Sequence, residues 1–588
     1  MKQFFKFMLA SMAGFTLTII IVFFLLIGLI ASLLSFAEQD VEPIGENTVL
    51  YINLNQTIYD RGSNSPLNSM DLFSLKPSRQ LGLNEILESI YYAKQDSNID
   101  GIYLELSSIP AGISTIEEIR NALIEFKKSG KFVISYSEYM TQSAYYLASV
   151  SDKIYHNPEG IFLFKGLSAQ VMYYKGLLEK LDVEAQVIKH GDYKSAVEPY
   201  LRKSMSKENE EQTQNYLDDV WDHMLANIAQ SRDTDTESLN KAAEGLIIQS
   251  LDKAIDHKLI DGLKYRDEIL SEIKELLGIG SKDDINSVSL SKYSLLPKPS
   301  LNSGRDKIAV IYGTGTIMAG SGDDQTMGSA RVSRAIRKAR LDKRVKAIVF
   351  RVNSGGGDVV ASEVIRREIE LAAQAKPVIA SFGDYAASGG YWVSCGATEI
   401  MASPVTLTGS IGVYAIFPNL NGLLNDKIGL SFDEVKTNKY ADFYTGTRSL
   451  SAYEKNLLTN NVEKTYDTFL ELVANGRDMK KTDVNAIAGG RIWSGIDAKS
   501  LGLIDSYGGL TAAINRAIDL ADLDTYRIIE LPEQKDPIEQ FIEDWTNAKA
   551  NSRIKEELGP LTRYIQPLKS LTEMKGVQVR LPFEITIE

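Results

Sequence analysis

The apolar residues of the chain are concentrated in one long run near its start. Thirty-one residues without a charge separate Lys6 from Glu38, and a helix of that length, at ~1.5 Å per residue, exceeds the ~30 Å hydrocarbon core of a bilayer. Basic residues precede the run and acidic residues follow it, so the positive-inside rule predicts a cytoplasmic N-terminus. We predict a membrane anchor over residues 1–40. A cleaved signal peptide is the alternative, because Ser35-Phe36-Ala37 resembles a cleavage site, although the apolar part of a signal is usually only ~7–15 residues long.

After this run, short apolar segments alternate with amphipathic ones. Ala347-Ile348-Val349-Phe350 is a short continuous apolar run, whereas apolar side chains recur at helical spacing from Val360 to Ile369. Alternation of this kind indicates parallel strands joined by crossover helices. The chain is therefore predicted to have an α/β fold.

The alternating pattern occurs twice. Residues 99–106 align with residues 345–352 at an offset of 246, and residues 131–135 align with residues 377–381 at the same offset. A helical match lies between these two pairs, and a fourth match follows further along the chain. Collinear matches at a nearly constant offset indicate an internal duplication.

The predicted organisation is an anchor, two homologous domains and a tail. The boundaries are residues 1–40 for the anchor, 45–284 for the first repeat, 285–304 for a linker, 305–535 for the second repeat and 536–588 for the tail. Six serines and two prolines favour a linker over 285–304, although the segment around Val288 also fits an edge strand. The tail is polar and irregular, and the sequence predicts no function for it.

Composition limits the chemistry. A net charge of −13 leaves no basic surplus for a phosphate backbone, so no nucleic-acid partner is expected. A single cysteine, Cys395, excludes an intrachain disulfide and a thiolate zinc site. The four histidines lack zinc-binding spacing and no phosphate-loop motif occurs, which argues against a zinc hydrolase and an NTPase. We expect no cofactor.

A glycine-rich segment follows the first matched strand of the second repeat. Asn353-Ser354-Gly355-Gly356-Gly357-Asp358 stands between this strand and a helix. Consecutive glycines let backbone N–H groups approach a ligand at the positive end of a helix dipole, an arrangement that suits an oxyanion. The first repeat has Ile109-Pro110-Ala111 here, and proline has no N–H to donate. A glycine-rich turn that binds nothing is the alternative.

A serine flanked by small residues follows the next strand of the second repeat. Ser388 stands before Gly389-Gly390 at the start of a helix, where neighbouring N–H groups are free. It is a candidate nucleophile, and an ordinary helix cap is the alternative. The corresponding residue of the first repeat is Gln142.

The serine needs a base, and no histidine follows it in the chain. This excludes the residue order of an α/β-hydrolase triad. A lysine serves as a base when burial lowers its pKa. When Tyr193 is aligned with Tyr440, Lys194 of the first repeat falls on Ala441 of the second. One repeat has the lysine and the other has the serine, which predicts one composite site; a solvated surface lysine is the alternative.

At these residues the sequence resembles the signal peptide peptidase A (protease IV) family in its long, duplicated bacterial form. The motifs that carry the resemblance are Asp192-Tyr193-Lys194-Ser195-Ala196-Val197-Glu198-Pro199, Asn353-Ser354-Gly355-Gly356-Gly357, Ala387-Ser388-Gly389-Gly390-Tyr391 and Leu407-Thr408-Gly409-Ser410-Ile411-Gly412. The resemblance covers essentially the whole chain. It implies two tandem Clp-protease/crotonase-like domains, each a spiral of ββα units.

The resemblance also implies residue roles. Ser388 corresponds to the family's nucleophile and Lys194 to its general base. Gly356 and Gly389 correspond to the residues whose N–H groups form the oxyanion hole, and Ser410 to a serine that hydrogen-bonds the lysine. A simple turn serine is the alternative for Ser410.

The remaining expectations come from the activity of the family. The resemblance implies a homotetramer in the bacterial inner membrane, with its catalytic domains on the periplasmic side, that cleaves signal-peptide remnants and other hydrophobic peptides without a cofactor. A crotonase-like acyl-thioester hydrolase is an alternative, because that fold also binds thioester oxyanions. A non-catalytic membrane scaffold is the second alternative.

Overall fold

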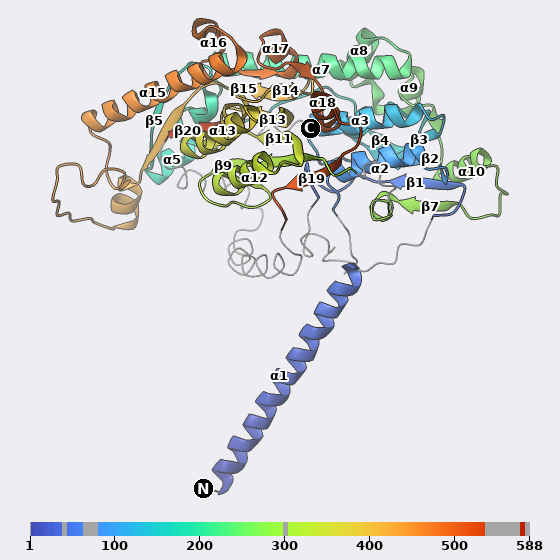
Figure 1. The fold of residues 1–588 in the computed structure, drawn as a ribbon, viewed down its shortest axis with the longest axis horizontal. Coiled ribbons are helices and arrows are strands. Elements are labelled where there is room, and N and C mark those ends of the chain that lie inside the picture. The colour runs from blue at the N-terminus through green and yellow to red at the C-terminus, as the bar shows by residue number, and fades with distance from the viewer. Residues whose placement is uncertain (1, 38–43, 63–79, 298–303, 535–576, 582–588) are drawn as a thin grey trace.

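The computed structural model has an α/β body from which one long helix projects (Figure 1). It describes residues 2–37, 44–62, 80–297, 304–534 and 577–581. The α/β fold predicted from the sequence is confirmed.

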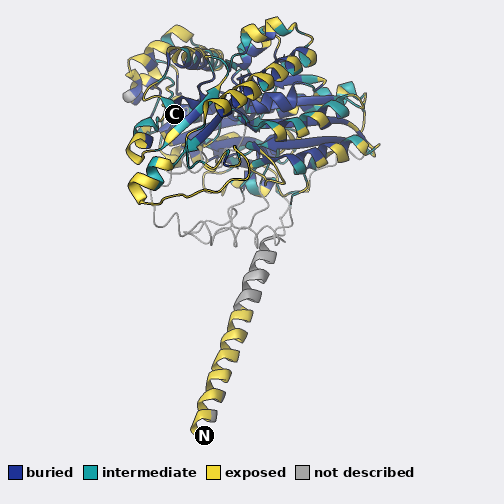
Figure 2. Ribbon diagram, turned by 90° about the vertical axis from the view of Figure 1, so that its left-hand side faces the viewer, coloured by how far each residue is buried: buried dark blue, intermediate teal, exposed yellow. Residues whose placement is uncertain are grey.

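The projecting helix is α1 (Lys2–Ala37). Its segment Lys6–Phe24 is apolar, long enough to cross a membrane and not buried against the rest of the chain, as its exposed colouring in Figure 2 shows. A signal sequence near the N-terminus has the same properties, so α1 is compatible with an anchor and with a signal. Residues 38–40, the end of the predicted anchor, lie outside the described residues.

The first repeat forms a six-stranded parallel sheet in the order β7-β1-β2-β3-β4-β6. Its strands are β1 (Thr48–Ile52), β2 (Ile99–Glu105), β3 (Phe132–Met140), β4 (Lys153–Phe162), β6 (Gly262–Leu263) and β7 (Asn286–Ser289). Its helices are α2 (Leu83–Gln95), α3 (Ile113–Lys127), α4 (Gln142–Ala148), α5 (Lys175–Leu181), α6 (Glu198–Leu201), α7 (Lys207–Arg232), α8 (Thr236–Glu244), α9 (Leu251–Asp256), α10 (Arg266–Leu277) and α11 (Leu290–Tyr293), with short 3₁₀ turns at Ser195–Val197 and Ile247–Gln249.

The second repeat has the same strand order, β19-β8-β11-β13-β14-β18, and again these strands are parallel. Its strands are β8 (Lys307–Thr314), β11 (Val345–Ser354), β13 (Val378–Ala387), β14 (Glu399–Ala402), β18 (Ser506–Tyr507) and β19 (Arg527–Leu531), with β15 (Leu407–Gly409) and β17 (Ile492–Ser494) as a branch on β13. Its helices are α12 (Ser329–Leu341), α13 (Val359–Ala373), α14 (Gly389–Ser394), α15 (Ala452–Arg477), α16 (Lys481–Ile487), α17 (Gly495–Ser500) and α18 (Leu510–Leu520), with a π-helix at Gly422–Ile428. The shared order supports the duplication.

A third sheet combines both repeats with the end of the chain, in the order β10-β9-β12-β20-β16-β5. Its strands are β5 (Glu184–Lys189), β9 (Thr316–Met318), β10 (Thr326–Gly328), β12 (Gly356–Asp358), β16 (Tyr414–Asn419) and β20 (Val577–Arg580). β5 belongs to the first repeat and pairs antiparallel with β16 of the second. This pairing brings the segment that follows β5 to the second repeat.

Two stretches expected to be irregular contain regular structure. β7 and α11 lie within 285–304, the stretch predicted as a linker, because Val288 is buried where β7 pairs with the edge of β1. β20 lies within the tail predicted to be irregular, because the alternating segment Val577–Arg580 fills the gap between two strand edges. Residues 535–576 and 582–588 lie outside the described residues.

The two repeats pack through a shared hydrophobic core and a buried ion-pair network. Apolar residues of both repeats, such as Ile116 and Leu510, belong to one cluster. Arg351 on β11 is 0% exposed, and its guanidinium contacts Asp60 and Glu118 of the first repeat at 2.7 Å each. A buried charge is tolerated only when it is paired, so this network fixes how the two repeats meet.

Candidate active site

The structure brings Lys194 of the first repeat into contact with Ser388 of the second. Lys194 directly precedes the 3₁₀ turn after β5, and Ser388 stands between β13 and α14. Lys194 Nζ lies 2.8 Å from Ser388 Oγ, and both residues are 0% exposed. The predicted composite arrangement is therefore present, and Lys194 is not a surface lysine.

Ser410 completes this group of polar atoms. It follows β15, and Lys194 Nζ lies 3.0 Å from its Oγ and 3.2 Å from its carbonyl oxygen. Ser410 is itself buried. The side-chain nitrogen of Lys194 thus has two hydroxyls and one carbonyl as hydrogen-bond partners, all of them uncharged.

The surroundings of Lys194 favour its neutral amine. Burial lowers the pKa of Lys194 well below its ordinary value, because a charged ammonium loses its hydration there. A neutral amine within hydrogen-bond distance of a serine hydroxyl is able to accept its proton. The arrangement suits a lysine base and a serine nucleophile.

The backbone at Ser388 is strained. Its φ of 56° and ψ of −114° lie in a region that residues with a side chain rarely adopt. Its N–H donates to the Gly409 carbonyl at 2.8 Å, and its side chain makes no capping hydrogen bond to α14. Ser388 is therefore not an ordinary helix cap, because its hydroxyl faces Lys194 instead.

Close contacts between two loops hold Lys194 in place. Gly490 has a φ of 86°, and a Cβ at this position would lie 2.6 Å from Lys194 Cα. Gly191 has a φ of 92°, and a Cβ there would lie 2.2 Å from the Gly489 carbonyl oxygen. Only glycine fits at these two positions. The absence of side chains there lets the segment from Gly191 to Lys194 approach the loop that contains Gly489 and Gly490, before β17.

Gln212 on α7 joins the same two loops. This buried side chain donates from Nε2 to Ser195 Oγ at 2.8 Å and to the Tyr193 carbonyl at 3.2 Å. Its Oε1 accepts from the Ile492 N–H at 3.1 Å. The Gln212 side chain therefore links Tyr193 and Ser195, the two neighbours of Lys194, to β17. β17 pairs with β15, the strand that directly precedes Ser410.

We expect Gln212→Ala to lower kcat/KM for a peptide substrate by about 10- to 100-fold, because small displacements of a catalytic group are costly. Steady-state kinetics with a fluorogenic peptide measures the effect. Gln214→Ala, which removes an exposed glutamine from the same helix, is the matched control and should leave kcat/KM unchanged. Equal effects of the two substitutions would contradict a positioning role for Gln212.

Two glycines proposed to bind an oxyanion lie side by side next to Ser388. A Cβ on Gly356 would come within 2.6 Å of the Gly389 nitrogen. The Gly356 N–H, however, already donates to Ser354 Oγ at 3.1 Å. Gly357 N lies 3.0 Å from the place that a Cβ on Gly389 would take. The assignment of the Gly356 and Gly389 N–H groups to the oxyanion stays a prediction, and the neighbouring Gly357 N–H is a further candidate donor.

Sequence reasoning did not single out Gly357, the third glycine of the same run, as a candidate donor. Glycine content indicated that a backbone N–H is accessible but did not distinguish between neighbouring N–H groups. The distinction depends on the contact of Gly356 with Ser354 Oγ, which the sequence does not reveal.

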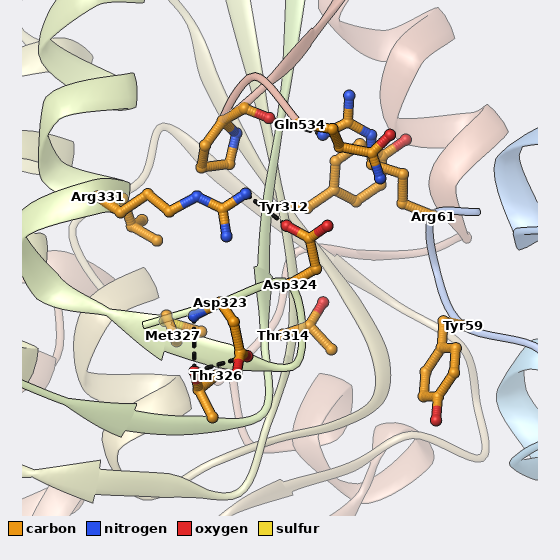
Figure 3. Close-up of a pocket in the computed structure, with 12 residues that line it drawn as sticks. Tyr59, Arg61, Tyr312, Thr314, Asp323, Asp324, Thr326, Met327, Arg331 and Gln534 are labelled. Carbon is orange, nitrogen blue, oxygen red and sulfur yellow. Dashed lines mark hydrogen bonds and ion pairs between the residues drawn. The ribbon is translucent and has the colours of Figure 1, made fainter. Parts of the chain in front are cut away.

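A separate, small pocket lies elsewhere, between the first repeat and the loop that contains β9 and β10. Figure 3 shows Arg61 and Tyr312 on one side and the ion pair of Arg331 with Asp324 on the other. Ser388 and Lys194 are not among its lining residues. Within the described part of the chain, no group of three or more histidine, cysteine, aspartate or glutamate side chains is arranged to hold a metal ion.

A comparison with protein-family models places two segments of the chain in one family. The family model for Peptidase family S49 matches residues 125–280 and 370–524. Lys194 lies in the first matched region and Ser388 in the second.

Curated relatives match most of the chain. Protease 4 of Salmonella typhi is 36% identical over 513 residues, which are 85% of this chain and 82% of that protein. Protease 4 of Haemophilus influenzae is 35% identical over 76% of this chain and 74% of that protein. The chloroplastic serine protease SPPA of Arabidopsis thaliana is 35% identical over 78% of this chain and 68% of that protein. Among solved structures, a mutant ClpP1 from Listeria monocytogenes matches 35% of this chain and 94% of its own, with 14% identity and a TM-score of 0.24.

Proposed function

The chain belongs to peptidase family S49 and is a serine peptidase, and from this premise we propose that Ser388 is its nucleophile and Lys194 its general base. The observation that carries the proposal is the 2.8 Å contact between Lys194 Nζ and Ser388 Oγ at a buried position. Because the chain belongs to a peptidase family, we do not propose the two alternative functions, an acyl-thioester hydrolase and a non-catalytic membrane scaffold.

In the first step, neutral Lys194 accepts the Ser388 hydroxyl proton while Oγ attacks the carbonyl carbon of the peptide bond. The new C–O bond places negative charge on the carbonyl oxygen. We assign the stabilisation of this oxyanion to the N–H group of Gly389 together with that of Gly356 or Gly357, because the backbones of these two glycines approach Gly389 closely.

In the second step, the oxyanion collapses and the C–N bond breaks. The Lys194 ammonium gives its proton to the departing amine, which leaves an ester on Ser388 Oγ. Lys194, neutral again, then accepts a proton from the water that attacks the ester carbonyl carbon. The bond between this carbon and Ser388 Oγ breaks, Lys194 returns the proton to Oγ, and the acid product departs. Ser410 keeps the lysine nitrogen in line with Ser388 through its hydroxyl and carbonyl.

The substrate class follows from the apolar helix at the N-terminus. If α1 is retained as an anchor, it keeps the site next to a bilayer, where signal-peptide remnants and other hydrophobic peptides accumulate. We therefore propose hydrophobic peptides as substrates. A homotetramer with its catalytic domains on the periplasmic side is part of the same proposal.

A serine-directed phosphonate probe tests the nucleophile. Wild-type protein should carry the probe on the peptide that contains Ser388, detected by mass spectrometry, and should cleave a hydrophobic reporter. Ser388→Ala should do neither. Ser394→Ala, which removes another buried hydroxyl from the adjacent helix, is the matched control and should keep both properties. Labelling of Ser388→Ala at another serine, with retained cleavage, would overturn the assignment.

A further inference from the structure

The loop that precedes β17 in the second repeat contacts the segment that carries Lys194. Arg491 lies in this loop, and its guanidinium carbon is 4.7 Å from the centre of the Tyr193 ring and 4.5 Å from the centre of the Trp493 ring. Both distances are within the range of a cation–π contact. Tyr193 is the residue before Lys194 and belongs to the first repeat. One side chain of the second repeat thus contacts the neighbour of the proposed general base.

The backbone of Arg491 contacts Ser410, a hydrogen-bond partner of Lys194. The Arg491 carbonyl accepts from the Ser410 N–H at 2.7 Å. Ser410 has a φ of 50°, which is unfavourable for a residue with a side chain, so its conformation depends on such contacts. Arg491 therefore joins the residue before Lys194 to the residue whose hydroxyl and carbonyl contact the Lys194 nitrogen.

The other contacts of the guanidinium fix its place. Arg491 Nη2 lies 2.9 Å from Glu211 Oε1 on α7, and the Tyr193 hydroxyl lies 3.3 Å from the second oxygen of the same carboxylate. Arg491 Nε is buried and has no hydrogen-bond partner among the described residues. A buried N–H without a partner costs stability. The observed conformation is therefore held by the two rings and by Glu211.

A second ring contact joins the same segment to the same loop. His190, four residues before Lys194, stacks on Tyr466 of α15 with 3.7 Å between the ring centres, and its Nδ1 is 2.7 Å from Glu463 Oε2. The Tyr466 hydroxyl accepts from the Gly489 N–H at 3.2 Å. The second repeat therefore contacts the segment of the lysine through aromatic rings at two places.

We propose that Arg491 is a positioning residue of the general base, which holds the Tyr193 ring and the Ser410 backbone together and so keeps the Lys194 nitrogen on Ser388. This inference rests on the proposed function of Ser388 and Lys194. A small displacement of a catalytic group lowers the rate of the chemical step. The contacts of Arg491 involve no residue that we assign to peptide binding, so its loss should lower kcat and leave KM unchanged.

Arg491→Met in the full chain tests the inference, because methionine has an unbranched stem but no guanidinium. We expect kcat for a hydrophobic reporter peptide to fall about tenfold, with KM within about twofold of the wild-type value. Lys499→Met is the matched control, because it removes an exposed cation 4.5 Å from the Tyr507 ring in the same repeat, and it should leave both constants unchanged. An unchanged kcat in Arg491→Met, or a loss that comes entirely through KM, would overturn the inference.

Variants of Tyr193 separate the ring contact from a general loss of structure. Tyr193→Leu should lower kcat as much as Arg491→Met does, and Tyr193→Phe, which keeps the ring, should recover most of that loss. The double variant Tyr193→Leu/Arg491→Met should lose no more than either single variant, because both substitutions break the same contact. Losses that multiply in the double variant, or equal losses in Tyr193→Phe and Tyr193→Leu, would show that the ring contact is not the cause and would overturn the inference.

Combination with Lys194→Met separates this inference from the proposed function. If Arg491 acts through Lys194, adding Arg491→Met to Lys194→Met should lower the residual kcat by no more than about twofold. A further loss of about tenfold in that background would overturn the inference and leave Lys194 as the base. Full activity in Lys194→Met would instead overturn the proposed function, and the inference with it.

Discussion

Replacing Lys194 with methionine is expected to lower kcat/KM for a hydrophobic peptide by about 10³- to 10⁴-fold, because a general base typically contributes up to that factor. Methionine is similar in length to the lysine stem and fills the buried site without an amine. Steady-state kinetics measures the loss. Lys189→Met is the control, because Lys189 is exposed on β5 and should leave activity unchanged. Substantial activity in Lys194→Met would show that the base lies elsewhere.

The pH dependence of the wild-type rate is a second test of Lys194 as the general base. Only the neutral amine accepts a proton, and burial lowers the pKa of Lys194. The rate should therefore rise as pH increases through this lowered pKa and then level off. The residual rate of Lys194→Met should lack that rise.

Lys194→Met should be more stable than the wild type although it is less active. Above the lowered pKa of Lys194 and below the ordinary lysine pKa, the unfolded chain binds a proton that the folded chain does not. The free energy of unfolding therefore rises with pH across this window. Folding the wild type in this window costs free energy because Lys194 has to lose its proton. Methionine has no proton to lose, so Lys194→Met should be more stable than the wild type at neutral pH in urea unfolding. If Lys194→Met were less stable than the wild type, the hypothesis that Lys194 is buried as a neutral amine would be wrong.

The composite site was accessible from sequence because the two repeats differ in complementary ways. Ser388 has no lysine in its own repeat at the matching position, and Lys194 has no matching serine. The absence of any histidine after Ser388 removed the common alternative base. Chemistry that depends on residue type and on alignment was therefore predictable.

Features that depend on contacts between distant segments were not predictable. One such contact is the hydrogen bond from the Gly356 N–H to Ser354 Oγ, which affects whether Gly356 or Gly357 can donate to an oxyanion. The strand Val577–Arg580 exists because two strand edges, from different parts of the second repeat, leave a gap that fits it. A short alternating segment carries no signal for its partners, so its position required the structure.

Arg351 was not singled out from the sequence either, although it governs how the repeats meet. It occupies a strand position whose neighbours are apolar, and its partners Asp60 and Glu118 are remote in the chain. Arg351 also donates to the Phe382 carbonyl on β13 at 3.1 Å, the strand that leads to Ser388. One buried guanidinium thus connects the first repeat to the strand that positions the nucleophile.

Arg351→Met is expected to lower the free energy of unfolding by about 3–5 kcal/mol, because it leaves two buried carboxylates without their cation. Urea unfolding measures the loss. Arg367→Met, which removes an exposed ion pair with Glu370, should cost only about 0–1 kcal/mol. Adding Asp60→Asn and Glu118→Gln to Arg351→Met should restore much of the lost stability, since neutral amides are cheaper to bury than carboxylates. If the triple variant were no more stable than Arg351→Met, the unpaired charges would not be the cause. Lost packing of the Arg351 side chain would then explain the effect.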